Sequence, residues 1–464
     1  MVLSDRMKVI SDTILAIRTR GLANLISAAD GQPFVLSDQV KGICDAIFAP
    51  KARGVTNLAI TPGDRTIALS DPMKAVYEGL FALKTRGLGH LVSEDTEMDG
   101  RHVTLAGRRH VNFGSCSYVG LETDDRLKDG ACDAIQKFGV QFASSRAYVS
   151  CTLYEELEDL LRRLFRSPIV IAQTTSLAHF SALPVLVGKE DAVLFDQFVH
   201  ASVQAVLPTL RQAGVHCRPV RHNQMSKLSA LIGDLAPKYR RVWYLADGVY
   251  SMGGDLCPTT ELRDLLNQHE KLHLYIDDAH GMSWTGRHGR GWILDRELIH
   301  PRMVVALSLA KAFSASGAAI VFPNAEWAHL VRTCGSTMIF SGPLQPALLG
   351  AAIASAKIHL SDEIDDRQRA LSERIDLFNS LCAKTGIRLG AMSRTPIRFV
   401  KVGPEDKTYL AAAELMKRGY FANVATFPAV PWRRAGLRIA LTVHQRLDDI
   451  RGLVDQLAPL VAQA

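Results

Sequence analysis

The sequence contains no apolar run that approaches the ~20 residues needed to cross a bilayer. Its N-terminus, MVLSDRMKVISD, also lacks the apolar core of a signal peptide. The eight cysteines include no Cys-x-x-Cys pair and show no zinc spacing, which predicts reduced thiols and no metal site. Lysine and arginine form no dense block, so we expect no nucleic-acid partner. Together these absences favour a cytoplasmic protein without a transmembrane segment.

What the chain does contain is ordinary for a globular enzyme. Of its 464 residues, 47% are hydrophobic and 22% are charged. This length allows two or three domains with a sizeable core. The net charge of +7 is spread along the chain, and so modest an excess is only a weak signal for a polyanionic small substrate.

An internal repeat with a period of 33 residues occupies the N-terminal fifth, in segments 3–25, 36–58 and 69–91. Each copy begins Leu-Ser-Asp, which can cap a helix, continues with apolar residues at helical spacing, and ends at Arg-Gly. The period equals that of ankyrin, but each copy lacks the second helix, which excludes that fold. We expect a helical extension over residues 1–92. It serves either as packing elements on one face of the fold or as a docking surface for a partner or carrier protein.

Short apolar runs alternate with helical patterns beyond residue 98. A β-hairpin is predicted first, turning at Ala106-Gly107. Strands separated by helices then indicate a mostly parallel, doubly wound α/β sheet, whose ligands bind at the carboxyl ends of the strands. The predicted strands are 168–173, 192–196, 215–220, 241–247, 272–277, 303–308 and 317–322.

Polar residues follow four of these predicted strands. Taken singly, each has a plain explanation, such as a helix cap or a core histidine. Together they place carboxylates, imidazoles, hydroxyls and a lysine around one crevice. This inventory suits an aldehyde cofactor with a basic ring nitrogen, held by the lysine. The residues are His200, Asp247, Ser251, Asp277, His280, Ser308 and Lys311.

Longer motifs lie between residues 80 and about 455, and their order along the chain is that of a known enzyme family. They resemble the α-oxoamine synthase family of pyridoxal-phosphate enzymes, within aminotransferase fold type I. The motifs are NFGSCSYVGL (112–121), RHNQM (221–225), ADGVYSMGGD (246–255), IDDAHG (276–281), GRHGRG (286–291), SLAKAFSASGAA (308–319), MIFSGPLQPA (338–347) and LRIALTVH (437–444).

The resemblance implies a role for each polar residue around pyridoxal 5′-phosphate. Lys311 is the Schiff-base lysine and Asp277 pairs with the pyridine nitrogen. His200 stacks on the ring, while His280 and Ser251 lie at the ring oxygen.

The remaining implied roles concern the phosphate and the substrate. Ser308 reaches the phosphate, and Ser341 does so from the neighbouring subunit of a homodimer with a shared active site. Arg438 holds the amino acid carboxylate, for which a guanidinium is well shaped. The small residues around Lys311 let the backbone approach the cofactor.

Two positions depart from the family pattern. At the helix that receives the phosphate, the usual Ser-Gly-aromatic is replaced by Thr174, Thr175 and Ser176, whose hydroxyls we expect to bind the phosphate beside the helix N-terminus. The usual asparagine that helps to hold the substrate carboxylate is replaced by Cys116, which leaves the identity of the amino acid open. Cys116 is interpreted as a buried filler or, less readily, as a reactive thiol.

The resemblance therefore implies a fold type I large domain over 93–345 and a smaller α+β domain over 346–464. It implies an acyltransferase that joins a small amino acid to an acyl thioester, on CoA or a carrier protein, with loss of CO₂. Lys311, His200, Asp277 and His280 are the expected catalytic residues. Two alternatives stay open: an aminotransferase or another pyridoxal-phosphate reaction, and a catalytically silent subunit of a synthase complex.

Overall fold

The computed structural model describes residues 58–60, 67–295 and 299–462. It divides into two compact units, residues 1–74 and 75–464, which are described separately. In the first unit, β1 (Leu58–Ile60) pairs antiparallel with β2 (Ile67–Leu69). The predicted first two repeats lie outside the described residues except for the last residue of the second. In the third repeat, helix α3 (Asp71–Thr85) forms as predicted, and the chain leaves it at Gly87, whose φ is 64°.

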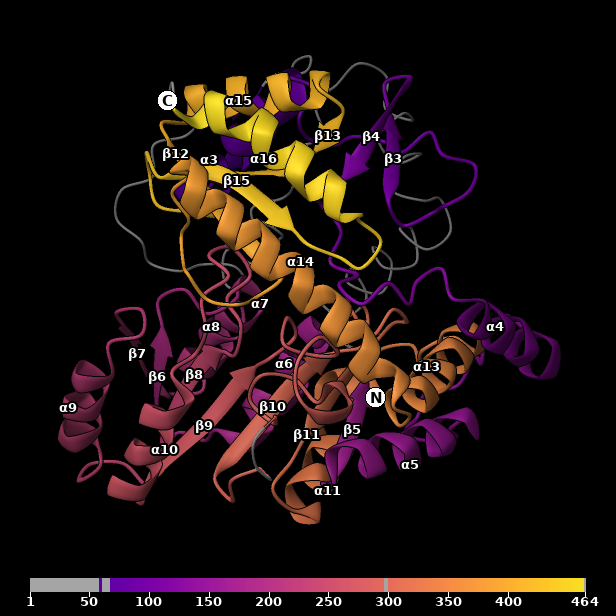
Figure 1. Ribbon diagram of the computed structural model, residues 1–464. Helices are drawn as coiled ribbons and strands as arrows, with labels where there is room; N and C mark the ends of the chain where they lie inside the picture. Colours follow the sequence, from indigo (N-terminus) through magenta and orange to yellow (C-terminus); the bar gives the residue numbers. More distant parts are fainter. Residues whose placement is uncertain (1–57, 61–66, 296–298, 463–464) are drawn as a thin grey trace, which may run out of the picture. The chain divides into compact units, whose positions relative to one another are not determined.

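A seven-stranded sheet forms the centre of the second unit, in the order β5-β11-β10-β9-β8-β6-β7 (Figure 1). Every pairing from β10 to β7 is parallel, and only β11 runs antiparallel to both of its neighbours. All seven predicted strands are present, so the prediction of a mostly parallel sheet is confirmed. The strands are β5 (Ile169–Ala172), β6 (Ala192–Asp196), β7 (His216–Val220), β8 (Val242–Asp247), β9 (Leu272–Asp277), β10 (Met303–Ser308) and β11 (Ala318–Val321).

Helices cover both faces of this sheet because its central strands are apolar on both sides. On β10, Val304 and Ala306 pack into a cluster with α6 and α11, while Val305 and Leu307 pack on the opposite face with α5 and α13. Helices α9 and α10 cover the other half of that second face. The helices are α4 (Asp125–Phe138), α5 (Leu153–Phe165), α6 (Thr175–Leu186), α7 (Ala201–Gln204), α8 (Leu207–Gln212), α9 (Met225–Leu235), α10 (Thr259–Gln268), α11 (Ala325–Cys334), α12 (Ser336–Ile339) and α13 (Pro346–His359).

The C-terminal part carries a second, three-stranded sheet in the order β12-β15-β14. Helix α14 connects it to the large sheet, and α15 and α16 pack against one another beside it (Figure 1). The predicted N-terminal hairpin, β3 (His102–Leu105) and β4 (Arg108–Asn112), joins this part of the chain through a parallel pairing of β4 with β13. The remaining elements are α14 (Glu363–Thr385), β12 (Ile397–Gly403), α15 (Glu405–Lys417), β13 (Tyr420–Phe421), β14 (Asn423–Ala425), β15 (Ala435–Ala440) and α16 (Leu447–Ala462).

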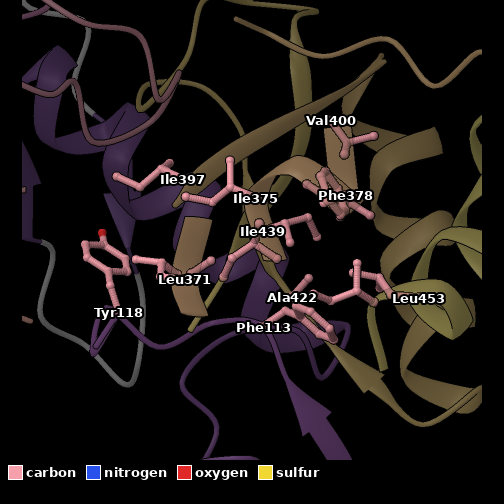
Figure 2. Close-up of a cluster of buried hydrophobic side chains, with 14 of the residues drawn as sticks. Phe113, Tyr118, Leu371, Ile375, Phe378, Ile397, Val400, Ala422, Ile439 and Leu453 are labelled. Atoms are coloured by element: carbon pink, nitrogen blue, oxygen red, sulfur yellow. The ribbon is translucent and has the colours of Figure 1, made fainter. Parts of the chain in front are cut away.

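One buried hydrophobic cluster fixes this C-terminal part to the segment that precedes α4. Phe113 and Tyr118 from that segment pack among side chains of α14, β12, β15 and α16 (Figure 2). Both residues are fully buried. The segment 112–121, which contains both residues, is thereby held beside β15, the strand that carries Arg438. Among the helices that the structure describes, none combines the length and the apolar character that a membrane span requires.

Candidate active site

A cavity of about 200 Å³ lies at the carboxyl ends of β6, β8, β9 and β10, beside the N-terminus of α6. This is where a doubly wound sheet is expected to bind its ligand. Ala310, Ser316 and Gly317, which flank Lys311, are part of the wall. Eight predicted cofactor residues from four separate segments line the cavity together: Thr174, Thr175, Ser176, His200, Asp277, His280, Ser308 and Lys311.

Lys311 lies in the tight connection between β10 and the antiparallel β11. Gly317 closes this connection with φ of 99°, and a side chain there would meet the carbonyl oxygen of Ala172 at 3.0 Å. The pKa of the Lys311 amine is lowered because the group is buried, although the charge of Asp277 acts in the opposite direction. A lowered pKa favours the neutral amine, which is the form that attacks an aldehyde or accepts a proton.

Asp277 ends β9 and is held by two donors inside the protein. Its Oδ1 accepts a hydrogen bond from the backbone N–H of Ala279 at 3.0 Å, and its Oδ2 lies 3.0 Å from Nε2 of His179. Burial raises the pKa of Asp277, but the charge and hydrogen bond of His179, with the charges of Lys311 and His200, lower it to about 2. The group is therefore a carboxylate, the state that keeps a facing pyridine nitrogen protonated.

His179 has a position that the sequence reasoning missed. It lies in α6 with 0% of its surface exposed, and its Nδ1 is 2.8 Å from the hydroxyl of Tyr275. The signal was available in the spacing, because His179 follows Thr175 by four residues and therefore shares a helix face with it. Tyr275, His179 and Asp277 form one continuous buried chain of hydrogen-bonding groups.

His280 also lines the cavity, and its ring orientation is fixed by Tyr118. The Tyr118 hydroxyl lies 2.8 Å from Nδ1 of His280. Burial raises the pKa of Tyr118 and lowers the pKa of His280, so the phenol is protonated and the imidazole is neutral. The phenol then donates to Nδ1, and the ring hydrogen lies on Nε2, where it can donate to a ligand oxygen.

His200 caps the N-terminus of the short helix α7, where its Nδ1 lies 2.6 Å from the hydroxyl of Ser202. Its backbone N–H donates to Oδ1 of Asp247 at 2.9 Å. The pKa of Asp247 is raised well above its usual range by burial and by the charge of Asp277. Asp247 is therefore a neutral carboxylic acid, and in this form it positions His200 through the backbone hydrogen bond. The sequence had suggested no role for Asp247.

Arg438 and Cys116, the two residues predicted to hold the substrate carboxylate, contact one another. The guanidinium of Arg438 donates to the carbonyl oxygen of Ser251 at 2.6 Å and to Sγ of Cys116 at 3.6 Å. Neither Arg438 nor Cys116 lines the small cavity. Ser341 follows α12 and does not line it within this chain either; its predicted role concerns a second subunit and stays a prediction.

A larger cavity of about 1130 Å³ shares His200 with the small one. Ser251 lines this larger cavity rather than the small one. Its wall combines aromatic and aliphatic side chains, including Phe198, Tyr250 and Phe399, with residues of the β12–β15 region. A small polar cavity and a roomy, partly apolar one therefore lie on either side of His200.

The small cavity fits pyridoxal 5′-phosphate on the chemistry of its donors. It offers an amine for the aldehyde, a buried carboxylate for the ring nitrogen, an imidazole N–H for the ring oxygen, and hydroxyls at a helix N-terminus for the phosphate. Within the described segments, no group of three histidine, cysteine, aspartate or glutamate residues is arranged to hold a metal ion.

Comparisons with known proteins agree with this chemistry. The profile of the family "Aminotransferase class I and II" matches residues 109–454. The 8-amino-7-oxononanoate synthase of Fervidobacterium nodosum is 31% identical over 363 residues, which cover 77% of this chain and 90% of that protein. The enzyme of the same name from Beijerinckia indica is 31% identical over 79% of this chain and 92% of that protein.

Solved structures show the same fold. Serine palmitoyltransferase from Sphingomonas wittichii superposes with a TM-score of 0.77 at 21% identity, covering 85% of this chain and 97% of that one. An 8-amino-7-oxononanoate synthase from Francisella tularensis superposes with a TM-score of 0.65 at 21% identity, covering 76% of this chain and 98% of that one.

Proposed function

The chain belongs to the aminotransferase class I and II family and, within it, to the pyridoxal-phosphate-dependent α-oxoamine synthases; from this premise we propose that it condenses a small amino acid with an acyl thioester, releases CO₂ and forms an α-aminoketone. The observation that carries the proposal is the position of His200 in the walls of both cavities. One holds Lys311 and Asp277, and the other has room and apolar surface for an acyl chain.

Pyridoxal phosphate, when bound, supplies an electrophilic aldehyde and a ring that accepts electrons from the substrate Cα. The Lys311 amine would hold the aldehyde, and its Nζ, when free, would accept the Cα proton. The Asp277 carboxylate would keep the ring nitrogen protonated, and the Nε2–H of His280 would donate to the ring oxygen. The Arg438 guanidinium binds the amino acid carboxylate.

The reaction then forms one carbon–carbon bond and breaks another. The deprotonated Cα forms a bond to the thioester carbonyl carbon, the C–S bond breaks, and the sulfur leaves as a thiolate, which takes a proton from solvent. The bond from Cα to the carboxylate carbon breaks next, releasing CO₂. Lys311 returns the proton to Cα, and His200, beside both compartments, orients or polarises the thioester carbonyl.

A second copy of the chain completes the site in this proposal, with Ser341 reaching the partner's cofactor phosphate. Exposed apolar side chains near Ser341 support such a contact. Phe340 is 85% exposed and Tyr148 is 87% exposed, and the loop that carries Tyr148 is tied to α12 by the hydrogen bond from Ser145 to the carbonyl of Ile339. We further propose the division into residues 1–92, 93–345 and 346–464.

The test is a panel of glycine, alanine and serine against acyl-CoA thioesters of increasing chain length, with product masses read by mass spectrometry. The proposal predicts an α-aminoketone for at least one pair and no product without the thioester. Transfer of the amino group to a keto acid, with the thioester left intact, would instead indicate an aminotransferase.

A further inference from the structure

The turn that carries Lys311 contains a serine in a strained backbone conformation. Ser314 has φ of 63°, a left-handed conformation that a residue other than glycine keeps only where its surroundings hold it. Its backbone N–H donates to the carbonyl oxygen of Lys311 at 2.9 Å. The conformation of Ser314 therefore helps to decide where the backbone of Lys311 lies and where its side chain begins.

The side chain of Ser314 is held from the segment 112–121. Its hydroxyl lies 3.1 Å from Oγ of Ser117, which is buried and lies 197 residues earlier in the chain. The carbonyl oxygens of Lys311 and Ala312 are farther from this hydroxyl, at 3.4 and 3.3 Å. Ser117 is therefore the nearest partner of the Ser314 hydroxyl.

The direction of these hydrogen bonds follows from a carboxylate beyond Ser117. Oε2 of Glu122 accepts the hydroxyl hydrogen of Ser117, and Oε1 of Glu122 lies 3.1 Å from Nε2 of His444. A carboxylate has no hydrogen to donate, so Ser117 and His444 both donate to it. Because Ser117 has then used its only hydrogen, its oxygen accepts the hydrogen bond from Ser314.

His444 holds the far end of this network beside β15. The backbone N–H of Val443 donates to the carbonyl oxygen of Tyr118 at 3.0 Å, which joins the two segments. A side chain at Gly120 would come within 2.9 Å of Nε2 of His444, so the imidazole is closely packed. Arg438, which is predicted to hold the substrate carboxylate, lies in β15, six residues before His444. The network therefore connects the predicted carboxylate site to the lysine turn.

We propose that four positioning residues aim the Lys311 amine at the substrate Cα in the reaction proposed above, on which this inference rests: Ser314, Ser117, Glu122 and His444. None of these four described residues lines the small cavity, so they act through Lys311 and not on the substrate. Position matters because the Nζ of Lys311 has to face the Cα proton, and a displacement of about 1 Å costs on the order of 100-fold in rate.

The test is exchange of the amino acid's Cα hydrogen with solvent deuterium, followed by NMR on the cofactor-loaded protein with glycine, alanine or serine and no thioester. Ser117→Ala and Ser314→Gly should each slow exchange per bound cofactor about three- to tenfold, the range expected for the loss of one or two hydrogen bonds. Amino acid affinity should change little, because Arg438 is untouched. Wild-type exchange rates in both variants, or no exchange in the wild-type protein with any of the three amino acids, would overturn the proposal.

A double variant separates positioning from a general loss of stability. Ser117→Ala combined with Ser314→Gly should exchange no more slowly than the slower single variant, because either change interrupts the same network. Effects that multiply would contradict a shared network. The matched control is Ser361→Ala, which removes a hydroxyl that donates to the carbonyl oxygen of Ile358 at 2.7 Å. It should exchange at the wild-type rate, and an equal loss in this control would remove the support for positioning.

Glu122→Gln tests the far half of the network. The amide offers one acceptor oxygen to two donors, so the hydrogen bond from Ser117 or the one from His444 is lost. Exchange should slow about threefold or more, the effect of one lost hydrogen bond to a charged group. An unchanged rate would show that Glu122 and His444 do not position Lys311.

Failure of the proposed function is visible separately, because exchange needs only the amino acid. Exchange that depends on Ser117 and Ser314, without any α-aminoketone in the product assay, would refute the acyl transfer and keep the positioning role. Formation of the α-aminoketone with normal exchange in every variant would refute the positioning role alone.

Discussion

Nε2 of His179 lies 3.0 Å from Oδ2 of Asp277 inside the large sheet, and the opposite ring nitrogen lies 2.8 Å from the hydroxyl of Tyr275. All three side chains are buried. If Tyr275 donates to Nδ1, the ring hydrogen is on Nε2 and points at Asp277. The carboxylate of Asp277 is thereby held from behind by an imidazole N–H of fixed orientation.

Replacing His179 with leucine should lower kcat about 10- to 100-fold, because a hydrogen bond to a charged group contributes about 1.5–3 kcal/mol. Without this donor the pKa of Asp277 rises from its value of about 2, so the acid limb of the pH–rate profile moves to higher pH. The matched control is His273→Leu. His273 is a buried histidine on β9, the strand that ends at Asp277, but it contacts the backbone carbonyl of Lys271 and not Asp277. An unchanged pH profile in His179→Leu would mean that His179 only fills space.

Lys311→Ala should retain part of the cofactor affinity and lose turnover by orders of magnitude, because the change removes both the covalent attachment and the base. The other groups of the cavity remain to bind phosphate and ring. Dialysis followed by absorbance measures retention, and product formation measures turnover. Turnover within tenfold of wild type would show that another group moves the Cα proton.

Arg438→Lys should raise the KM for the amino acid and leave the KM for the thioester nearly unchanged, because an ammonium cannot replace the planar guanidinium. Cys116→Asn should act in the opposite direction. The Cys116 thiol lies 3.6 Å from the Arg438 guanidinium, and an amide there adds a stronger donor for the carboxylate. Steady-state kinetics with each substrate varied in turn measures the two KM values. Parallel changes in both would contradict the assignment of Arg438 and Cys116 to the amino acid carboxylate.

His222 makes the stability of the fold depend on pH. Burial lowers its pKa, but Asp196 at 3.0 Å and Asp255 at 2.6 Å raise it to about 9. Because the folded value lies above the ordinary 6.5, this stabilisation is complete below pH 6.5 and is lost as pH rises through 9. Phe198, Asn223 and Tyr250 surround the pair and carry no charge near neutral pH.

The free energy of unfolding should therefore fall by up to about 3 kcal/mol between pH 6.5 and 9 in the wild-type protein, as its folded-state pKa of about 9 requires. His222→Gln should have a flatter profile in this range and lower stability at pH 6.5. Denaturant unfolding at several pH values measures both. A variant with the wild-type slope would show that other groups cause the dependence.

The positions of the strand ends could be read from the sequence because each buried strand is a short apolar run followed by a polar residue. This pattern predicts that His200, Asp277, Ser308 and Lys311 lie around one crevice, and all four line the same cavity. The antiparallel direction of β11 was not predicted. The nine residues from Leu309 to Gly317 are too few for the crossover that a parallel neighbour needs, which explains the direction.

What the sequence did not reveal depends on contacts between distant segments. His179 contacts Asp277 because α6 packs against β9. Its spacing from Thr175 indicated the helix face on which it lies, but not that Asp277 would be its partner. The hairpin β3–β4 was predicted, but its pairing with β13, about 310 residues further on, was not.

The central claim is that Lys311 carries the cofactor. It is tested most directly by borohydride reduction of the cofactor-loaded protein, followed by digestion and peptide mass spectrometry. The assignment predicts the pyridoxyl mass on the peptide that contains Lys311 and on no other. The label on a different lysine, or no label on protein that has taken up pyridoxal phosphate, would contradict it.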